Sequence, residues 1–491
     1  MHLIRTWFTD RMSISLRNMP SFGHVAAEDD PVLSYFLTTE AVNKIRSGDI
    51  MLVLGRKGTG KTALVRYFTE TDNKSLSKPL NLRNYPWQIH ETRLDAGASP
   101  IEAYVASWRY IIAAQMASAS ISHGYAANEA SQAIITFFND NYGTPNPNFA
   151  DLLRPDRLKL SKFSFEPQIF GNKIFNIELG AKSRFNFGRE IDALTDGLID
   201  AIPRVSRNTK QIGLHFDELD QGLVDIDDKR KAMIVGLILA ARSINQKLNN
   251  KSIFNVVIYL RSDIWDSLVF SDKNKINSTN TLSLKWDDGN LLKLINERLR
   301  AKLDPAASWS DAADDKLMRG SQKKWNHILA RTFLRPRDVI KFLNTSLDVA
   351  KLRDDEPLML SNEDIVSSRE EYSLYLKREL DDEIMNHWKH WDEALQACSR
   401  IGAITFDREA FLAEYNTVKS TENELSADEA LRTLYNFSVI AYEKRSGYGG
   451  SAWSFKYAEQ NNVWDNSAMR FKVHLGLKEY AKLREERQNF V

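Results

Sequence analysis

Apolar and polar positions follow two patterns along this chain, and the first extends to about residue 300. Runs rich in apolar residues stand at 50–54, 212–216 and 253–260, and each is a predicted strand. The first is typical of a strand that is buried on both faces, and apolar residues alternate in the second. A further strand is predicted at Trp87–Leu94, and a helix follows it at about Ile101–Ala119. Because strands alternate with helical stretches, the pattern predicts an α/β fold built on a parallel sheet.

Beyond about residue 300 the pattern is helical, and at residue 400 it changes to short strands and helices. Residues 351–399 are charged and predicted to be helical, and residues 400–491 are predicted to form a winged helix. Its predicted elements are a strand at Ile404–Phe406, helices at Arg408–Tyr415 and from Ser426 through Tyr435, strands at Phe437–Tyr442 and Ala452–Tyr457, and a glycine-rich wing tip at residues 446–450. Asp407 is the predicted cap of the first helix, and Ser426 with Glu429 forms a predicted capping box for the second.

A glycine-rich loop joins the first predicted strand to a helix. It consists of Gly55, Arg56, Lys57, Gly58, Thr59, Gly60, Lys61 and Thr62, and Ala63 continues into the helix. The glycines permit backbone conformations closed to other residues, so that amide groups can turn inward around phosphate oxygens. Lys61 would then reach the β- and γ-phosphates, and Thr62 would bind magnesium. The pattern predicts an ATP site to which all nine residues contribute, with Lys61 also catalytic.

Two acidic residues follow the second apolar run. Asp217 is the predicted second magnesium ligand, and Glu218 would orient and polarise the water that attacks the γ-phosphate. In an open α/β sheet, ligands lie at the carboxyl ends of strands, which is where both residues stand. Taken alone, the two acids are also compatible with a simple cap at the end of a strand. Because they follow the glycine-rich loop in the expected order, the pair favours ATP hydrolysis.

An arginine ends the third apolar run. Arg261 is a candidate sensor of the γ-phosphate, because multi-strand P-loop ATPases carry a polar residue at this strand end. The alternative is a surface arginine that pairs with Asp263. Both interpretations stay open at the level of the sequence.

Composition limits the classes of function. The 491 residues suggest about two to four domains, and 43% hydrophobic with 27% charged residues is ordinary for a globular protein. A net charge of +1 gives no overall attraction to nucleic acid or to an anionic membrane. The one cysteine, Cys398, excludes a disulfide framework within the chain and fits a cytoplasmic location. No apolar run approaches the length of a membrane span, so we expect no membrane association.

Several segments, in this order, resemble bacterial AAA-type P-loop ATPases, and in particular the FunZ-like group. They are Phe22-Gly23 with Ala26–Asp30, the loop at 55–62, Phe216–Asp220, Leu260–Ile264, Arg335–Asp338 and Leu434–Ser438. The resemblance implies a helical lid that Pro336 opens, with Arg337 touching the γ-phosphate as a second sensor. Related lids often carry glycine where this chain has Leu334, and the alternative for Arg337 is a solvated residue of the first helical turn. Relatives of this kind act as regulatory switches and in bacterial defence systems.

The predicted fold class is α/β, with a P-loop NTPase (AAA-type) three-layer core, a helical lid and a C-terminal winged helix. The predicted domains are an N-terminal segment at 1–48, the ATPase core at 49–300 with an insertion at about 125–185, the lid at 301–350, a helical connector at 351–399 and the winged helix at 400–491.

A second copy of the chain, another protein and DNA are the candidate partners. Arg298 or Arg300 is positioned to reach a neighbouring subunit's nucleotide in a homo-oligomer, or to pair with Glu297 or Asp304. The helix of the winged helix that would enter a DNA groove is acidic, so we expect this domain to contact protein rather than DNA.

Three functions compete. The first is an ATP-hydrolysing switch that controls assembly or partner binding. The second is a DNA-binding winged-helix protein with a regulatory ATPase, which the basic residues at 154–162 and in the wing, Lys444 and Arg445, motivate. The third is a nucleotide-binding scaffold without catalysis.

Overall fold

The structure is a computed structural model of the whole chain. It describes residues 14–71, 76–82, 100–122, 124–147, 151–153, 184–205, 211–219, 227–248, 254–445, 451–458 and 462–485. The chain divides into two compact units. We call Thr38–Lys285 the sheet unit, and Met1–Leu37 with Trp286–Val491 the helical unit.

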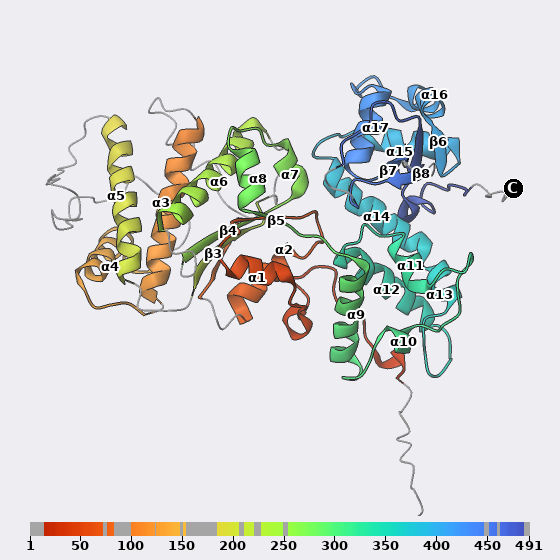
Figure 1. The fold of residues 1–491 in the computed structure, drawn as a ribbon, viewed down its shortest axis with the longest axis horizontal. Helices are drawn as coiled ribbons and strands as arrows, with labels where there is room; N and C mark the ends of the chain where they lie inside the picture. Colours follow the sequence, from red (N-terminus) through yellow and green to blue (C-terminus); the bar gives the residue numbers. More distant parts are fainter. Residues whose placement is uncertain are drawn as a thin grey trace, which may run out of the picture. The chain divides into compact units, whose positions relative to one another are not determined.

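The sheet unit is built on a parallel sheet (Figure 1). Its strands are β1 (Leu52–Leu54), β2 (Lys78–Asn81), β3 (Ile212–Asp217), β4 (Phe254–Leu260) and β5 (Thr281–Ser283), in the spatial order β2-β3-β4-β1-β5. β3 and β4 are buried along their whole length, as the apolar runs predict. Because Leu54 pairs with Leu260 and Asn81 with Asp217, neighbouring strands end together at one edge of the sheet.

Helices cover both faces of this sheet. They are α1 (Glu40–Arg46), α2 (Lys61–Arg66) with a π-helical extension (Tyr67–Thr71), α3 (Pro100–Ser122), α4 (Glu129–Tyr142), α5 (Arg184–Val205), α6 (Asp228–Leu248), α7 (Ser262–Ser267) and α8 (Lys273–Thr279). On one face, Trp108 of α3 packs edge-on against Phe216 and donates its ring N–H to the carbonyl of Met233 in α6. On the other, Phe68 stacks on His215. Since successive strand residues point to opposite faces, the three-layer α/β arrangement is confirmed.

The close contact between α3 and α6 depends on one glycine. A Cβ atom at Gly236 would lie 2.7 Å from the Cβ of Tyr104, which is closer than real side chains approach. The two helices lie together along the sheet in Figure 1. Both are buried over most of their length, which is expected of helices that are apolar nearly all round.

The strand beside β3 differs from the predicted one. Trp87–Leu94 lies outside the described residues, whereas the paired strand is Lys78–Asn81. It contains Pro79, which an edge strand tolerates because one row of its amides has no partner strand. The predicted helix at Ile101–Ala119 is confirmed as α3. Within the predicted insertion, α4 is described, while the basic residues at 154–162 lie outside the described part.

The helical unit contains the remaining elements. Its helices are α9 (Asp288–Lys302), α10 (Trp309–Ala312), α11 (Lys324–Leu329), α12 (Pro336–Ala350), α13 (Asn362–Ser367), α14 (Arg369–Ile384), α15 (Trp391–Ile401), α16 (Arg408–Val418) and α17 (Ala427–Asn436). Its strands are β6 (Thr405–Asp407), β7 (Ile440–Arg445), β8 (Ser451–Ser454) and β9 (Arg470–Val473), which form an antiparallel sheet in the order β6-β9-β7-β8. Short 3-10 turns stand at Leu16–Asn18, Val32–Tyr35 and Leu475–Leu477.

The boundary between the units falls before α9 rather than at residue 300. The reason is packing, because Leu291 and Ile295 of α9 are buried in the same core as Phe342 of α12. The N-terminal segment also joins this core through Leu16 and Phe22. Residues 286–300, at the end of the predicted ATPase core, and residues 1–37, in the predicted segment before it, therefore belong to the helical unit.

Residues 400–485 partly follow the predicted pattern. The capping box of Ser426 and Glu429 is confirmed at α17. Asp407 is the N-cap residue of α16, as predicted, but its side chain makes no capping hydrogen bond and instead faces Arg470 at 3.6 Å. The strand β9 was not predicted, and residues 446–450 lie outside the described part. The winged-helix assignment stays a prediction. Among the described residues, no helix has the length and apolar character of a bilayer span.

Candidate nucleotide site

The glycine-rich loop runs from the end of β1 into α2. Gly58 and Gly60 have φ values of 81° and 95°, in the left-handed region that other residues seldom adopt. Gly55 is needed for a different reason, because a Cβ there would overlap the hydroxyl of Thr59. That hydroxyl donates to the carbonyl of Arg56 at 2.9 Å and closes the loop on itself. The loop shape therefore follows directly from the glycine positions.

Lys61 lies over this loop. Its Nζ atom donates to the carbonyl oxygens of Gly55 and Arg56, at 2.9 and 3.2 Å. A phosphate oxygen is a stronger partner for an ammonium group than a carbonyl oxygen, because the hydrogen bond then joins two charges. The arrangement holds the lysine where an anion bound by the loop would meet it.

The loop and the end of β3 are joined by one hydrogen bond. The Thr62 hydroxyl donates to Oδ2 of Asp217 at 2.9 Å, although the two residues are 155 positions apart. Asp217 is buried, with 6% of its surface exposed. A hydroxyl and a carboxylate are oxygen ligands of the kind that Mg²⁺ prefers, and magnesium sites usually combine one or two such groups with phosphate oxygens. The two residues predicted as metal ligands therefore lie together and fit that ion.

Glu218 follows Asp217 in an unusual backbone conformation. Its φ is 59°, which is in the left-handed region, and its side chain is buried. A residue other than glycine in this region costs about 1–3 kcal/mol, and such costs are concentrated at functional sites. The conformation turns the chain immediately after the strand end that carries Asp217.

Arg261 follows the end of β4 and is buried rather than at the surface. Its guanidinium forms a two-point ion pair with Asp263, with Nε and Nη2 at 3.0 and 2.7 Å from the carboxylate oxygens. The amide of Gly55 donates to the carbonyl of Leu260, so Arg261 directly follows a residue bonded to the loop. Arg261 therefore pairs with Asp263, as in the alternative interpretation, but it does so at the end of β4, next to the loop, and not at the surface. Its sensor role stays a prediction.

A polar group that the sequence analysis missed lies beside the site. His215 Nδ1 is 2.9 Å from the hydroxyl of Tyr259 and its Nε2 is 3.1 Å from the hydroxyl of Ser77. Burial, and then the charge of Asp217, raise the pKa of Tyr259 well above its usual value. The period of two along β3 places His215 on the same face as Asp217, which was the signal available in the sequence. This group links β3 and β4 to the residue that precedes β2 and, through Phe68, to the extension of α2.

Arg337 lies in the helical unit, in the first turn of α12. Its Nε donates to the carbonyl of Val25 at 3.1 Å, and Nη1 lies 3.2 Å from a carboxylate oxygen of Glu379. It is therefore anchored and not simply solvated. Leu334, which stands in the place of the glycine of related lids, has a φ of 51°. The chain keeps the backbone shape that glycine would adopt, so this departure from the lid pattern does not alter the start of α12.

The two arginines considered for action between subunits differ in their surroundings. Arg298 is buried and pairs with Asp30 at 2.9 Å, and it also donates to the carbonyl of Phe22. Its guanidinium lies 4.5 Å from the centre of the Tyr35 ring. Arg300 is exposed and pairs with Glu297 at 2.6 Å. Of the two, only Arg300 is placed to reach a second molecule.

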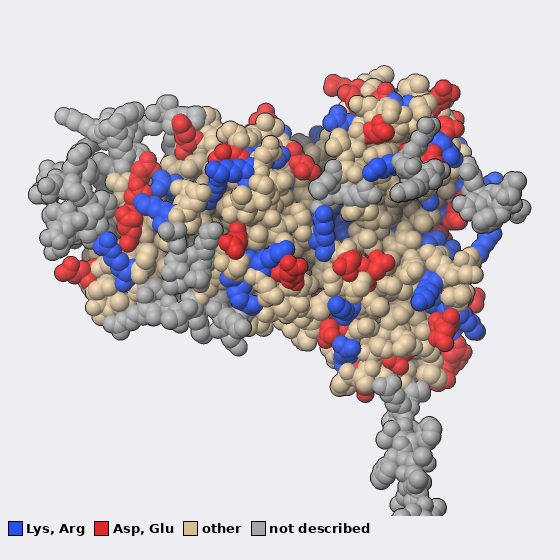
Figure 2. Space-filling model, in the orientation of Figure 1, with Lys and Arg blue, Asp and Glu red and all other residues tan. Residues whose placement is uncertain are grey.

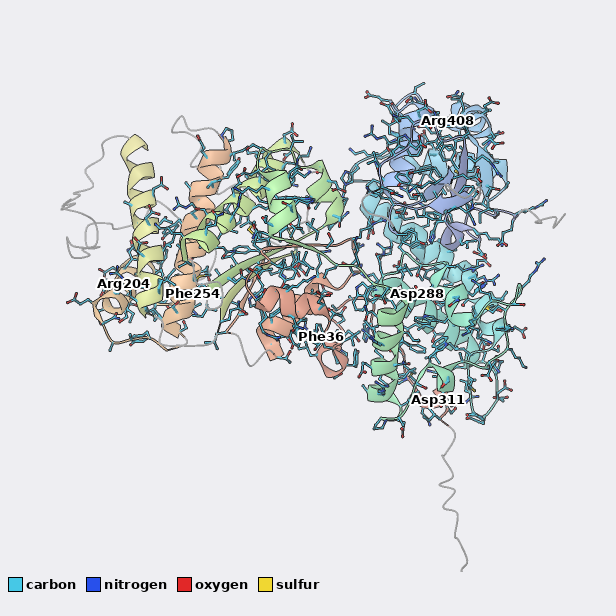
Figure 3. The ribbon with its side chains drawn as sticks, in the orientation of Figure 1. Phe36, Arg204, Phe254, Asp288, Asp311 and Arg408 are labelled. Atoms are coloured by element: carbon cyan, nitrogen blue, oxygen red, sulfur yellow. The ribbon has the colours of Figure 1, made fainter. Side chains whose placement is uncertain are left out.

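Acidic residues of the last domain pair with basic residues of the same domain. Asp428 of α17 pairs with Arg408, labelled in Figure 3, which also donates to the carbonyls of Asn466 and Ala468. On the face drawn in Figure 2, acidic and basic side chains of the described residues are interspersed. No continuous basic surface stands out on that face.

Comparisons with known proteins find one family model that matches part of this chain. Residues 289–381, which run from the start of α9 into α14, match the model of the FunZ-associated C-terminal helical domain. No curated protein matches the chain. A glycine-rich loop between β1 and α2, followed by an acidic strand end in a parallel sheet with helices on both faces, is the arrangement of an α/β P-loop NTPase core.

Three solved structures are similar over most of their length. The ORC1 protein of Aeropyrum pernix, solved in complex with DNA, is 12% identical, with 90% of each chain covered and a TM-score of 0.34. A Walker-type ATPase of Pyrococcus abyssi is 12% identical, with 89% of this chain and 96% of that chain covered and a TM-score of 0.37. Cdc6p of Pyrobaculum aerophilum is 11% identical, with 92% and 96% covered and a TM-score of 0.32. These scores indicate a distant likeness. The match at residues 289–381 confirms the resemblance to FunZ-like AAA-type ATPases that the sequence indicated.

Proposed function

We propose that this protein binds ATP with Mg²⁺, hydrolyses the nucleotide and uses its state to switch assembly or partner binding. The contact between Thr62 and Asp217 carries the proposal. It unites the two halves of a P-loop ATPase site from segments far apart in the chain, at the strand edge where open α/β sheets bind ligands.

Each residue of the site has a proposed role. The amides of the loop from Gly55 to Ala63 hold the phosphates, and Lys61 exchanges its carbonyl partners for β- and γ-phosphate oxygens. Thr62 and Asp217 hold Mg²⁺, which supplies charge stabilisation to the phosphates when bound. Glu218 orients the attacking water and accepts its proton. Arg261 reports the γ-phosphate from the end of β4.

The proposed switch uses the lid. Arg337 is held by Glu379 and by the carbonyl of Val25, and both partners belong to the helical unit. Binding of the γ-phosphate by Arg337 would replace these contacts, and it would thereby couple the nucleotide to the N-terminal segment. We propose a homo-oligomer or a protein partner as the assembly that responds, in the cytoplasm and in a regulatory or defence system. DNA contact through the last domain is the alternative.

The test compares ATP turnover in the wild-type chain and in two variants of it. Lys61→Ala should lose magnesium-dependent phosphate release by at least about 100-fold, because it removes a charge that is worth several kcal/mol in the transition state. Lys44→Ala is the matched control, since Lys44 is exposed on α1 and, within the described part of the chain, forms an ion pair only with Glu40. If wild-type protein releases phosphate no faster than Lys61→Ala, hydrolysis is excluded and a binding scaffold remains. Mass measurement of the assembly with and without ATP tests the switch.

A further inference from the structure

Two arginines of the helical unit lie in a partly enclosed cluster that the nucleotide site does not use. Arg331 follows α11 and is 5% exposed, and Arg369 begins α14. Neither guanidinium forms an ion pair with a carboxylate of any described residue. The Nε atom of each is enclosed and has no hydrogen-bond acceptor within the described part of the chain.

One histidine holds both arginines. Nη1 of Arg331 donates to the backbone carbonyl of His327 at 3.2 Å, and Nη2 of Arg369 donates to the ring Nε2 of His327 at 2.6 Å. Because arginine has no acceptor, Nε2 must accept, so the ring proton sits on Nδ1 and is donated to Oε1 of Gln322 at 3.1 Å. His327 is therefore neutral, and it orients Arg369 without adding a further positive charge.

The electrostatics of the cluster are unfavourable as it stands. Burial lowers the pKa of Arg331 to about 10, and the charge of Arg369 adds to this effect while Glu479 and Glu485 oppose it. The guanidinium still carries its charge at neutral pH. Glu485 is itself bound to Lys478 at 2.5 Å, so it does not neutralise the arginines directly.

Other buried arginines of this unit have carboxylate partners. Arg298 pairs with Asp30, and Arg335 pairs with both Asp338 and Glu383. Enclosing a charge without a counter-ion is costly, so proteins normally supply one from the chain or from a ligand. Among the described residues of this unit, Arg331 and Arg369 have no direct ion pair, and Glu479 and Glu485 act on them only from further away, so we expect a counter-ion from outside.

We propose that Arg331 and Arg369 form a binding site for the phosphate group of a small molecule. Nη2 of Arg331 and Nη1 of Arg369 make no hydrogen bond to any described residue and are not among the enclosed atoms, so they are the donors available to it. Arginine presents planar, forked donors that match the oxygens of a phosphate. The nearby carboxylates of Glu479 and Glu485 would repel an extended polyanion, which favours a single compact phosphate over a nucleic-acid backbone.

The ligand is either free inorganic phosphate or the terminal phosphate of a nucleotide, and both present the same chemistry to the arginines. The site lies entirely in the helical unit and uses none of the residues of the P-loop. It therefore stands whether or not the chain hydrolyses ATP. Filling it would join the end of α11 to the start of α14. The C-terminal segment also lies here, because Gly476 packs against the backbone of Arg331.

The test is a calorimetric titration of the full chain with inorganic phosphate, in a chloride buffer of constant ionic strength. Lys61→Ala serves as the background, because it weakens phosphate binding at the P-loop. In this background we expect saturable binding that Arg369→Gln weakens by at least about tenfold. Arg331→Lys, which keeps the charge and loses the fork, should give a smaller loss. Arg319→Gln is the matched control, since Arg319 is an exposed arginine of the same unit.

Unfolding curves in phosphate-free buffer establish that the variants are folded. Arg369→Gln should unfold there at the same temperature as Arg319→Gln or above it, because it removes a charge that lacks a counter-ion. Titrations with ADP and ATP then identify the source, since tighter binding than that of phosphate points to a nucleotide and weaker binding points to the free ion. No saturable binding by any of the three ligands, or equal affinity in Arg369→Gln and its control, would overturn the proposal.

Discussion

In the sheet unit, the lysine of the candidate site binds groups that a nucleotide can replace, whereas two buried arginines of the helical unit bind carboxylates of their own chain. Lys61 lies on two backbone carbonyls. Arg298, by contrast, is enclosed with Asp30, and Arg335 with Asp338 and Glu383. The first arrangement leaves charge ready for a ligand, and the second uses it to hold helices and the N-terminal segment in place.

This difference teaches how far a single charged residue indicates a function. A lysine that follows a loop of defined backbone shape has few other tasks, because the glycines fix where it lies. An arginine on an amphipathic helix can have many roles, and its role depends on which side chains the rest of the chain packs against it. Arg298 and Arg300 are two positions apart, yet only one of them is exposed. The following changes test this comparison, from the largest expected effect to the smallest.

The largest effect is expected at Glu218 in the sheet unit. Glu218→Gln keeps the shape of the side chain and removes its basicity, so ATP should still bind while turnover falls by about 10²–10⁴-fold. Phosphate release and binding of a fluorescent ATP analogue, measured on the same samples, separate the two steps. Glu70→Gln is the control, because Glu70 pairs with Arg66 at the surface of the same unit. Turnover that survives in Glu218→Gln would assign the base to another residue.

In the helical unit, Arg298 and Arg300 should behave as opposites. Arg298→Ala leaves Asp30 buried without its partner, and the free energy of unfolding should fall by about 3–5 kcal/mol. Arg300→Ala removes an exposed pair and should change it by less than about 0.5 kcal/mol. Denaturant unfolding of the full chain measures both. Equal stability of the two variants would mean that the N-terminal segment is not held through Arg298.

Arg300 can also be tested for a role in ATP turnover between subunits. If the chain works as an oligomer, Arg300→Ala should lower turnover only at concentrations where copies associate, because an arginine that acts between subunits needs a neighbour. A loss that does not depend on concentration would indicate a role within one chain.

The candidate site was predictable because its information is local. Three glycines, a lysine and a threonine at fixed spacing specify the loop, and an apolar run followed by two acids specifies the strand end. The contact of Thr62 with Asp217 followed from the rule that parallel strands end together. The parallel sheet was predictable for the same reason, since β3 and β4 are mostly apolar and are separated by a helical stretch.

What escaped prediction depends on residues that are distant in sequence. β2 has one buried residue and contains Pro79, so it lacks the pattern of a buried strand. Glu379 was not foreseen as the partner of Arg337, nor Asp30 as that of Arg298, because each pair forms through tertiary packing. The boundary before α9 likewise depends on which core its apolar face enters.

A smaller effect is expected from pH at His327. Burial, and then Arg331 and Arg369, lower its pKa to about 3, below the usual value of about 6.5 in an unfolded chain. Between these values the unfolded state binds the extra proton, so stability is full above pH 6.5 and is lost as the pH falls. From pH 6.5 to 5 the loss should be about 2 kcal/mol. His327→Gln should remove this part of the pH dependence in thermal unfolding, whereas His24→Gln, at an exposed histidine, should leave it in place.

The smallest effect is expected at Leu334, a leucine in a backbone conformation that favours glycine. Leu334→Gly relieves a left-handed conformation that costs about 1–2 kcal/mol, and it loses the contact of a partly buried side chain with the core, worth a similar amount. The two terms nearly cancel, so the midpoint of thermal unfolding should move little. Leu334→Val keeps an apolar side chain but places a β-branched residue at positive φ, and it should destabilise the chain by about 1 kcal/mol or more relative to the glycine variant. If valine is tolerated as well as glycine, then packing rather than backbone conformation determines this position, and the start of α12 does not depend on the glycine-like turn.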